Sequence, residues 1–206
     1  MRTIAFAGRF IWALVAAALA AGCTIGASSR TEIAFYDFGP ASVAPGRPVL
    51  SKSLLVHDVV APAWMDSASI FYRLAYVDAA RAHAYAGSRW VMAPASLFGA
   101  RLRQRLSAAS SAGVVLPEAA LRTEFALRVE LDEFAQHFDA ADRSRALVRL
   151  RATLSGRLGL VAQRAVSIEK PSATADARGG ARALAVASDE AIDQLLGWVA
   201  AQMAGN

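Results

Sequence analysis

Two neighbouring segments with alternating apolar and polar residues constrain the fold of this chain more than any other feature. Residues 124–138 and 146–160 each place apolar side chains at every second position, which is the period of a half-buried β-strand. The polar connection at residues 139–144 predicts that the two form a long antiparallel hairpin. A third strand at residues 161–168 would extend it. The apolar positions are Phe125, Leu127, Val129 and Leu131 in the first segment, and Val148, Leu150, Ala152, Leu154 and Leu158 in the second.

The alternation of the first segment slips by one residue near its middle. After Glu133, the apolar side chains return one position late, at Phe134 and Phe138. One extra residue in a strand produces such a slip, so the sequence predicts a β-bulge near Asp132 and Glu133. The other face of the hairpin carries acids on the first strand and arginines on the second. Cross-strand ion pairs of this kind contribute about 0.2–1 kcal/mol each.

The remaining pattern predicts four short strands and two principal helices. The strands are expected at residues 34–38, 50–60, 69–76 and 84–92, and the helices at residues 94–109 and 181–203. We therefore expect an α+β fold: a single domain over residues 34–204, with a mainly antiparallel sheet and both helices packed on it. In the first helix Phe98, Leu102 and Leu106 form the inward stripe, while Arg101, Arg103 and Arg105 form a basic face. In the second helix Asp189, Glu190, Asp193 and Gln194 form the side that faces water.

The N-terminus has the pattern of a secretion signal. Arg2 and Arg9 precede an apolar stretch at residues 10–21, which is about a dozen residues where a membrane-spanning helix needs roughly 20. The small residues Ala20, Ala21 and Gly22 then lead to Cys23, the only cysteine in the chain. This segment resembles a bacterial lipobox, although Ala20 stands where the usual leucine would be. We expect residues 1–22 to be a lipoprotein signal peptide and residues 23–33 a lipidated N-terminus and tether.

The alternative reading of the leader is a soluble secreted protein. A cut after Ala18-Leu19-Ala20 would leave a free thiol at Cys23. If Cys23 is lipidated, Thr24 after it favours the outer membrane, because an aspartate there commonly signals retention at the inner membrane.

Charge and motifs exclude several functional classes. Loss of Arg2 and Arg9 lowers the count of Lys and Arg from 22 to 20 against 17 acids, so the mature charge is +3 and no nucleic-acid partner is expected. The chain lacks GxSxG, GxGxxG, GxxxxGK[ST] and CxxC motifs. We therefore assign no catalytic residue, no cofactor and no metal site. Only convergence of His57, His83 or His137 with acids in one cleft would indicate an envelope hydrolase.

Two tryptophans are candidates for contact with a partner. Trp64 and Trp90 are large apolar residues, and each could equally belong to the core. Trp64 is the stronger candidate, because it lies in the loop-like stretch at residues 61–66, and exposed apolar side chains often mark contact surfaces.

A series of segments resembles the ABC-type transport auxiliary lipoprotein family, which includes the lipoprotein component of paraquat-inducible (Pqi) type systems. The segments are the leader with Cys23, VHDVVAPAWMD at 56–66, IFYR at 70–73, SRW at 88–90, AP at 93–94, LDEF at 131–134 and LLGW at 195–198. The resemblance implies a non-enzymatic lipoprotein, anchored at the outer membrane and facing the periplasm. It further implies that this protein docks an MCE-domain protein, as part of an MCE-type ABC transport system that moves lipids across the envelope.

The resemblance carries over one functional residue, the lipidated Cys23, through which the protein would contact the membrane. Self-association into a homo-oligomer is left open. The alternative function is a periplasmic lipid carrier with an internal apolar cavity, and a cavity of several hundred cubic ångströms would favour it.

Overall fold

The computed structural model describes residues 32–41, 50–119 and 121–205. Cys23, the expected signal peptide and most of the expected tether lie outside these residues. Residues Ile33–Asn206 form one compact unit, which contains every element described below. Its described buried apolar residues run from Phe38 to Met203, so this unit carries its own core. Among the described helices, none combines the length and the apolar character needed to cross a membrane.

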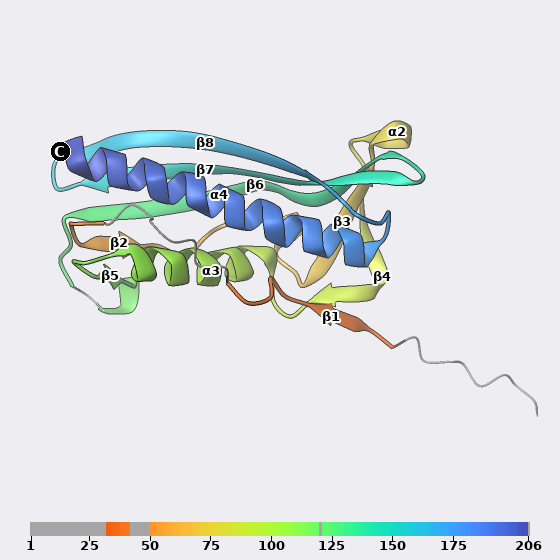
Figure 1. Cartoon of the computed structure of the whole chain (residues 1–206), viewed down its shortest axis with the longest axis horizontal. Helices are drawn as coiled ribbons and strands as arrows, with labels where there is room; N and C mark the ends of the chain where they lie inside the picture. Colours follow the sequence, from red (N-terminus) through yellow and green to blue (C-terminus); the bar gives the residue numbers. More distant parts are fainter. Residues whose placement is uncertain (1–31, 42–49, 120, 206) are drawn as a thin grey trace, which may run out of the picture. The chain divides into compact units, whose positions relative to one another are not determined.

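Three long strands form an antiparallel meander (Figure 1). They are β6 (Phe125–Ala140), β7 (Arg143–Gly156) and β8 (Gly159–Pro171). The expected hairpin, its third strand and its bulge are confirmed, since the register of β6 on β7 shifts between Leu131 and Glu133. The second strand ends at Gly156, four residues before the expected end, so Leu158, expected on the buried face, lies fully exposed in the turn between β7 and β8.

Five shorter strands complete one mixed sheet. They are β1 (Ala34–Tyr36), β2 (Leu54–Val56), β3 (Ser69–Leu74), β4 (Ala82–Trp90) and β5 (Val114–Val115). The sheet order is β1-β4-β3-β6-β2-β5, with β7 paired to β6 and β8 paired to β7. Strand β5 was not expected from the sequence, and the strand expected at residues 50–60 is regular only in β2.

The expectation of a mainly antiparallel sheet is wrong. One edge of β6 pairs with β7, and its other edge is shared by β2 near its start and β3 near its end, both parallel to it. The pairs β1–β4 and β2–β5 are parallel as well. Parallel neighbours need long connections between them. Here segments distant in sequence supply the neighbours, and the alternation within one strand does not specify them.

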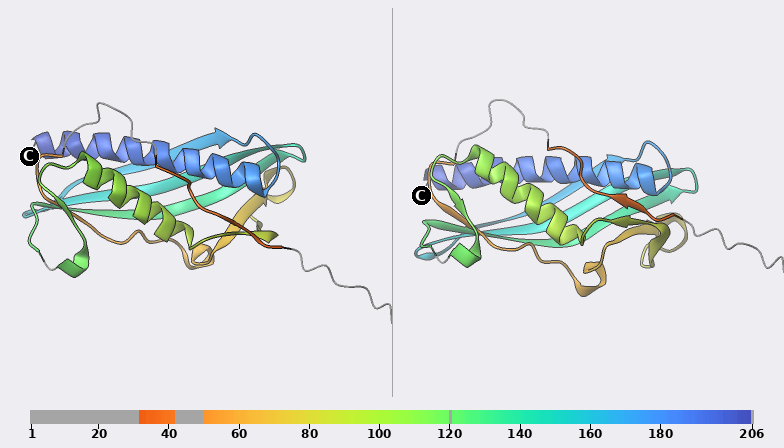
Figure 2. Two further views of the ribbon diagram at one scale, coloured as in Figure 1. Left: turned by 60° about the horizontal axis from the view of Figure 1, so that its bottom comes forward. Right: turned by 90° about the horizontal axis from the view of Figure 1, so that it is seen from below.

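Two helices cover one face of the sheet (Figure 2). Helix α3 (Pro94–Ala109) has the expected bounds, and α4 (Ala177–Gly205) begins four residues earlier than expected. The early start follows from Asp176, whose carboxylate accepts a hydrogen bond of 2.7 Å from the Gly179 N–H and so caps the helix. Three further helical segments are short: η2 (Ala63–Met65), α2 (Ala75–Asp78) and η3 (Pro117–Ala119).

The two faces of the sheet differ in chemistry. The face under α3 and α4, called the helix face, holds the apolar core, including Leu127, Leu150 and Ile168. The opposite face, called the outer face, carries charged side chains of β6 and β7. The expected ladder of cross-strand ion pairs is present there, because Arg151 lies 3.0 Å from Asp132 and 3.6 Å from Glu130.

Candidate functional site

The crossing from β2 to β3 places an aromatic side chain on the outer face. Pro62 ends the extended chain, and its carbonyl accepts a hydrogen bond of 2.9 Å from the Met65 N–H, which closes the short η2 turn. Met65 is fully buried and fixes the turn to the core, whereas Trp64 is 38% exposed. Val60, in the same crossing, is 40% exposed. Trp64 and Val60 are therefore two large apolar side chains that this crossing leaves exposed.

Trp64 is held in place by two side chains of β3. Its ring makes an edge-to-face contact with Phe71, with ring centroids 5.2 Å apart. The guanidinium of Arg73 lies 5.1 Å from the ring centroid, in the geometry of a cation–π contact. Two independent contacts leave the ring little freedom, so an incoming partner would meet a surface that is already ordered.

Arg73 is itself fixed by a carboxylate on β6. Its guanidinium donates two hydrogen bonds to Glu133, of 3.0 and 3.2 Å, and one of 3.0 Å to the Ala80 carbonyl. Both side chains of the ion pair are only 13% exposed. His137, in register with Arg73, brings Nε2 to 3.5 Å from Glu133 Oε1. Trp64, Arg73, Glu133 and His137 thus form one connected cluster, here called the Trp64 cluster.

The electrostatics of the Trp64 cluster favour the ionised carboxylate. Burial alone would raise the pKa of Glu133, but the contacts with His137 and Arg73 outweigh burial and hold that pKa below its ordinary value of 4.5. By geometry, the two hydrogen bonds from Arg73 are stronger than the single 3.5 Å approach of His137. The ion pair therefore persists at neutral pH and keeps Arg73 under Trp64.

The structure separates the two tryptophans that the sequence proposed as contact residues. Trp90 is fully buried on the helix face, between Phe38 at 5.8 Å and Phe134 at 5.9 Å between ring centroids. Its side chain has no exposed surface to offer a partner, so we retain only Trp64 as a contact candidate.

The three histidines do not share a cleft. His83 stacks on Tyr72, which pairs with Gln136 and so lies on the helix face, opposite His137. His57 follows β2, and its N–H donates to the carbonyl of Leu127, ten residues from His137 along β6. Among residues 32–41, 50–119 and 121–205, no group of three or more His, Cys, Asp or Glu side chains could hold a metal ion. The envelope-hydrolase hypothesis gains no support.

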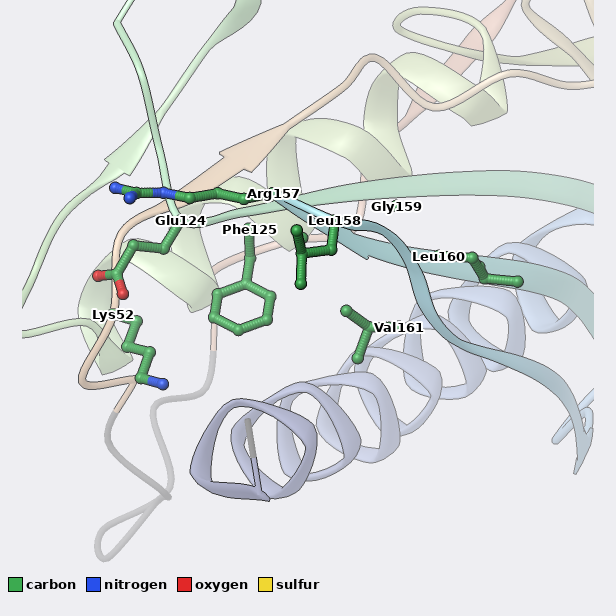
Figure 3. Close-up of a pocket in the computed structure, with 9 residues that line it drawn as sticks. Lys52, Glu124, Phe125, Arg157, Leu158, Gly159, Leu160 and Val161 are labelled. Atoms are coloured by element: carbon green, nitrogen blue, oxygen red, sulfur yellow. The ribbon is translucent and has the colours of Figure 1, made fainter.

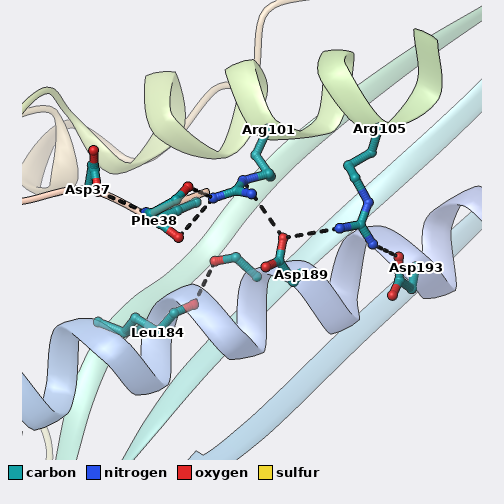
Figure 4. Close-up of polar contacts among 9 residues, drawn as sticks. Asp37, Phe38, Arg101, Arg105, Leu184, Asp189 and Asp193 are labelled. Carbon is teal, nitrogen blue, oxygen red and sulfur yellow. Dashed lines mark hydrogen bonds and ion pairs between the residues drawn. The ribbon is translucent and has the colours of Figure 1, made fainter. Parts of the chain in front are cut away.

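A polar network between the two helices was missed by the sequence analysis (Figure 4). Arg101 and Arg105 were expected on an exposed basic face, but their side chains are only 5% and 3% exposed. Both approach Asp189 of α4, at 3.8 and 3.7 Å, and Arg105 also pairs with Asp193. Arg101 further donates to the carbonyl of Phe38 at 2.8 Å. The signal was available, since each helix carries charges of one sign four residues apart, on a single face.

An open pocket lies at one end of the sheet (Figure 3). Its volume is about 410 Å³, and it opens to the surface beside the turn between β7 and β8. Phe125 and Val161 line its inner part, and Lys52, Glu124 and Arg157 add charged side chains. It is open to the surface and has charged as well as apolar side chains in its lining, so it differs from the internal apolar cavity expected of a carrier.

Solved structures share this fold. Protein XCC0632 from Xanthomonas campestris is 20% identical, with 82% of this chain and 95% of that chain covered and a TM-score of 0.70. A second structure, of an uncharacterized protein, is 14% identical, with 80% and 97% covered and a TM-score of 0.60. At these identities the likeness shows the fold alone. No curated protein matches the chain.

A family model identifies the chain more specifically. The model of the ABC-type transport auxiliary lipoprotein component matches residues 36–197, which extend from β1 into the last part of α4. The match covers most of the chain, including the Trp64 cluster, all of α3 and most of α4. The chain therefore belongs to the ABC-type transport auxiliary lipoprotein family.

Proposed function

We propose that the protein is a non-enzymatic docking component of an MCE-type ABC transport system that moves lipids across the cell envelope. It is held at the outer membrane, facing the periplasm, by lipid on Cys23. An MCE-domain protein binds it through the surface around Trp64. The family supplies the transport context, and the Trp64 cluster supplies the physical argument for docking.

The observation that carries the proposal is an exposed aromatic ring on a largely charged face. Trp64 is 38% exposed although Phe71 and Arg73 fix its orientation. Tryptophans and arginines are the residues most enriched at the energetic centres of protein interfaces. Preorganisation also lowers the conformational entropy lost when a partner binds. Both arguments favour a partner at this surface.

The alternative, a lipid carrier, has less support. A carrier needs an enclosed apolar space large enough for acyl chains. The pocket of about 410 Å³ is open and carries Lys52, Glu124 and Arg157 at its walls. Between the sheet and the helices the described side chains pack as a core. These features favour a docking function over a lipid-carrier function.

Crosslinking in intact cells tests the docking proposal. A photoreactive phenylalanine analogue replaces Trp64 in the full chain, and a matched variant carries it at Val186, which is 56% exposed on α4. We expect the position-64 variant alone to capture an MCE-domain protein. Equal capture at both positions would refute the proposed surface, and capture of phospholipid alone at position 64 would favour the carrier.

The anchor has a separate test. Replacing Cys23 with serine should abolish labelling of the protein by fatty acid. Unchanged labelling in this variant would refute lipidation at Cys23, and would leave the docking test unaffected.

A further inference from the structure

The turn between β7 and β8 contains an apolar residue where such turns usually carry small polar ones, and that residue packs against nothing. It is a two-residue turn, Arg157 and Leu158, between the paired Gly156 and Gly159. Such turns favour Asn, Asp and Gly. Leu158 nevertheless occupies this one, with its side chain fully exposed at 105%. When a local rule is broken without structural compensation, a functional reason is the expected cause.

The surroundings of Leu158 extend this apolar feature. Leu160, two residues along β8, is 66% exposed. Behind the turn lies the pocket of about 410 Å³, with Phe125 and Val161 among its lining side chains (Figure 3). The turn and the start of β8 thus present two exposed leucines beside an open recess. We call Leu158, Leu160 and this recess the leucine tip.

Basic side chains border the leucine tip. Arg157 belongs to the turn itself, and the ammonium group of Lys52 lies 5.6 Å from the Phe125 ring centroid. Glu124 is the acid among the side chains that line the pocket, so the two cations outnumber it. The tip therefore combines protruding apolar side chains with a net positive rim.

We propose that the leucine tip is a membrane-contact site that inserts into a bilayer containing acidic phospholipids. Leu158 and Leu160 enter the acyl boundary, while Lys52 and Arg157 lie at the level of the phosphates. Interfacial segments combine apolar insertion and basic flanks in this way, and the long stems of Lys and Arg let the charges stay in the headgroup layer. A wedge that projects from a turn suits a deformable lipid layer better than the flat centre of a protein interface. The site depends neither on Cys23 nor on the Trp64 cluster.

A fluorescent label at position 158 tests the proposal without the lipid anchor. The fragment of residues 24–206 contains no cysteine and includes the compact unit Ile33–Asn206 with its core. L158C therefore provides a unique thiol for an environment-sensitive dye (NBD). V186C, at an exposed position of α4, is the matched control. The probes are vesicles of phosphatidylcholine, with or without phosphatidylglycerol.

We expect the emission at position 158 to shift to the blue with phosphatidylglycerol vesicles and to be quenched by nitroxide-labelled lipids, while position 186 does not change. L158S/L160S should lower vesicle partitioning in a sedimentation assay by at least about tenfold, from the lost apolar burial. K52Q/R157Q should weaken binding and its dependence on salt. A label at 158 that stays in water with every vesicle would overturn the proposal and indicate a protein partner. Equal insertion into neutral vesicles would overturn the role of the cations.

Discussion

Removing the carboxylate of Asp189 should destabilise the fold far more than its position on a helix surface would suggest. Asp189 lies between the guanidinium groups of Arg101 and Arg105, which are 5% and 3% exposed. Truncating one partner of a buried ion pair typically costs about 3–5 kcal/mol, because it leaves a buried charge without its counterion. Both arginines would face that loss after Asp189→Ala.

Three features of the structure reduce this magnitude. Arg105 keeps its pair with Asp193, Arg101 keeps the Phe38 carbonyl, and Asp189 itself is 27% exposed. Alanine also raises the helix propensity of α4 by about 0.5 kcal/mol. We therefore expect Asp189→Ala to lower the free energy of unfolding by about 2–3 kcal/mol.

Urea unfolding of residues 24–206, followed by tryptophan fluorescence, measures this loss. Glu190→Ala is the matched control, since Glu190 is the neighbouring acid on the same helix and pairs with Lys170 at exposures of 41% and 32%. An exposed pair contributes less than about 1 kcal/mol. If Asp189→Ala loses no more stability than Glu190→Ala, the network does not stabilise the contact between α3 and α4, and the reasoning fails.

Further predictions concern two glycines, the core tryptophan and the buried carboxylate. Gly180→Ala should lower the free energy of unfolding by about 2 kcal/mol in a thermal unfolding assay, because the new Cβ would lie 2.1 Å from Gln136 Oε1. Gly197→Ala meets nothing within 4 Å and should raise it by about 0.4–1 kcal/mol, so equal effects of the two variants would contradict this reasoning. Trp90→Ala should lose about 3–5 kcal/mol by urea titration, and a loss below 1 kcal/mol would show that the site refills. The pKa of Glu133 in the folded protein lies below its ordinary 4.5, so the stability that its carboxylate contributes is complete above pH 4.5 and is lost as the pH falls through the folded pKa. Glu133→Gln should therefore flatten the acid side of a curve of stability against pH, and an unchanged acid side would contradict this.

The antiparallel part of the sheet could be predicted because its information is local. Alternation within residues 124–160 determines which side chains face the core, and a short connection determines the partner strand. The parallel pairs could not be predicted in this way. Val56 lies beside Leu127, and Tyr72 beside Gln136, across more than sixty residues of chain. The alternation of a single strand carries no record of such neighbours, so the mixed sheet emerged only from the structure.

The candidate site was predictable in part for the same reason. Trp64 stood out because its segment lacks the periodicity of a buried element, and exposure at that position follows. Its supports, Arg73 and Glu133, are distant in sequence, and each alone is an ordinary charged residue on a strand. The buried Arg101 shows the converse error: a residue expected on a basic helix face lies against α4, because its counterion Asp189 is there.

The β-bulge connects the core to the Trp64 cluster. Before the bulge, odd-numbered residues such as Leu131 face the helices, and unbroken alternation would send Glu133 into the core as well. The shift instead turns Glu133 toward Arg73 on the outer face and places Phe134 against Trp90 on the helix face. One extra residue thus avoids an unpaired buried charge, completes the aromatic core, and supplies the carboxylate that fixes the arginine under the exposed tryptophan. The rigidity of the proposed docking surface therefore depends on the same irregularity that completes the core.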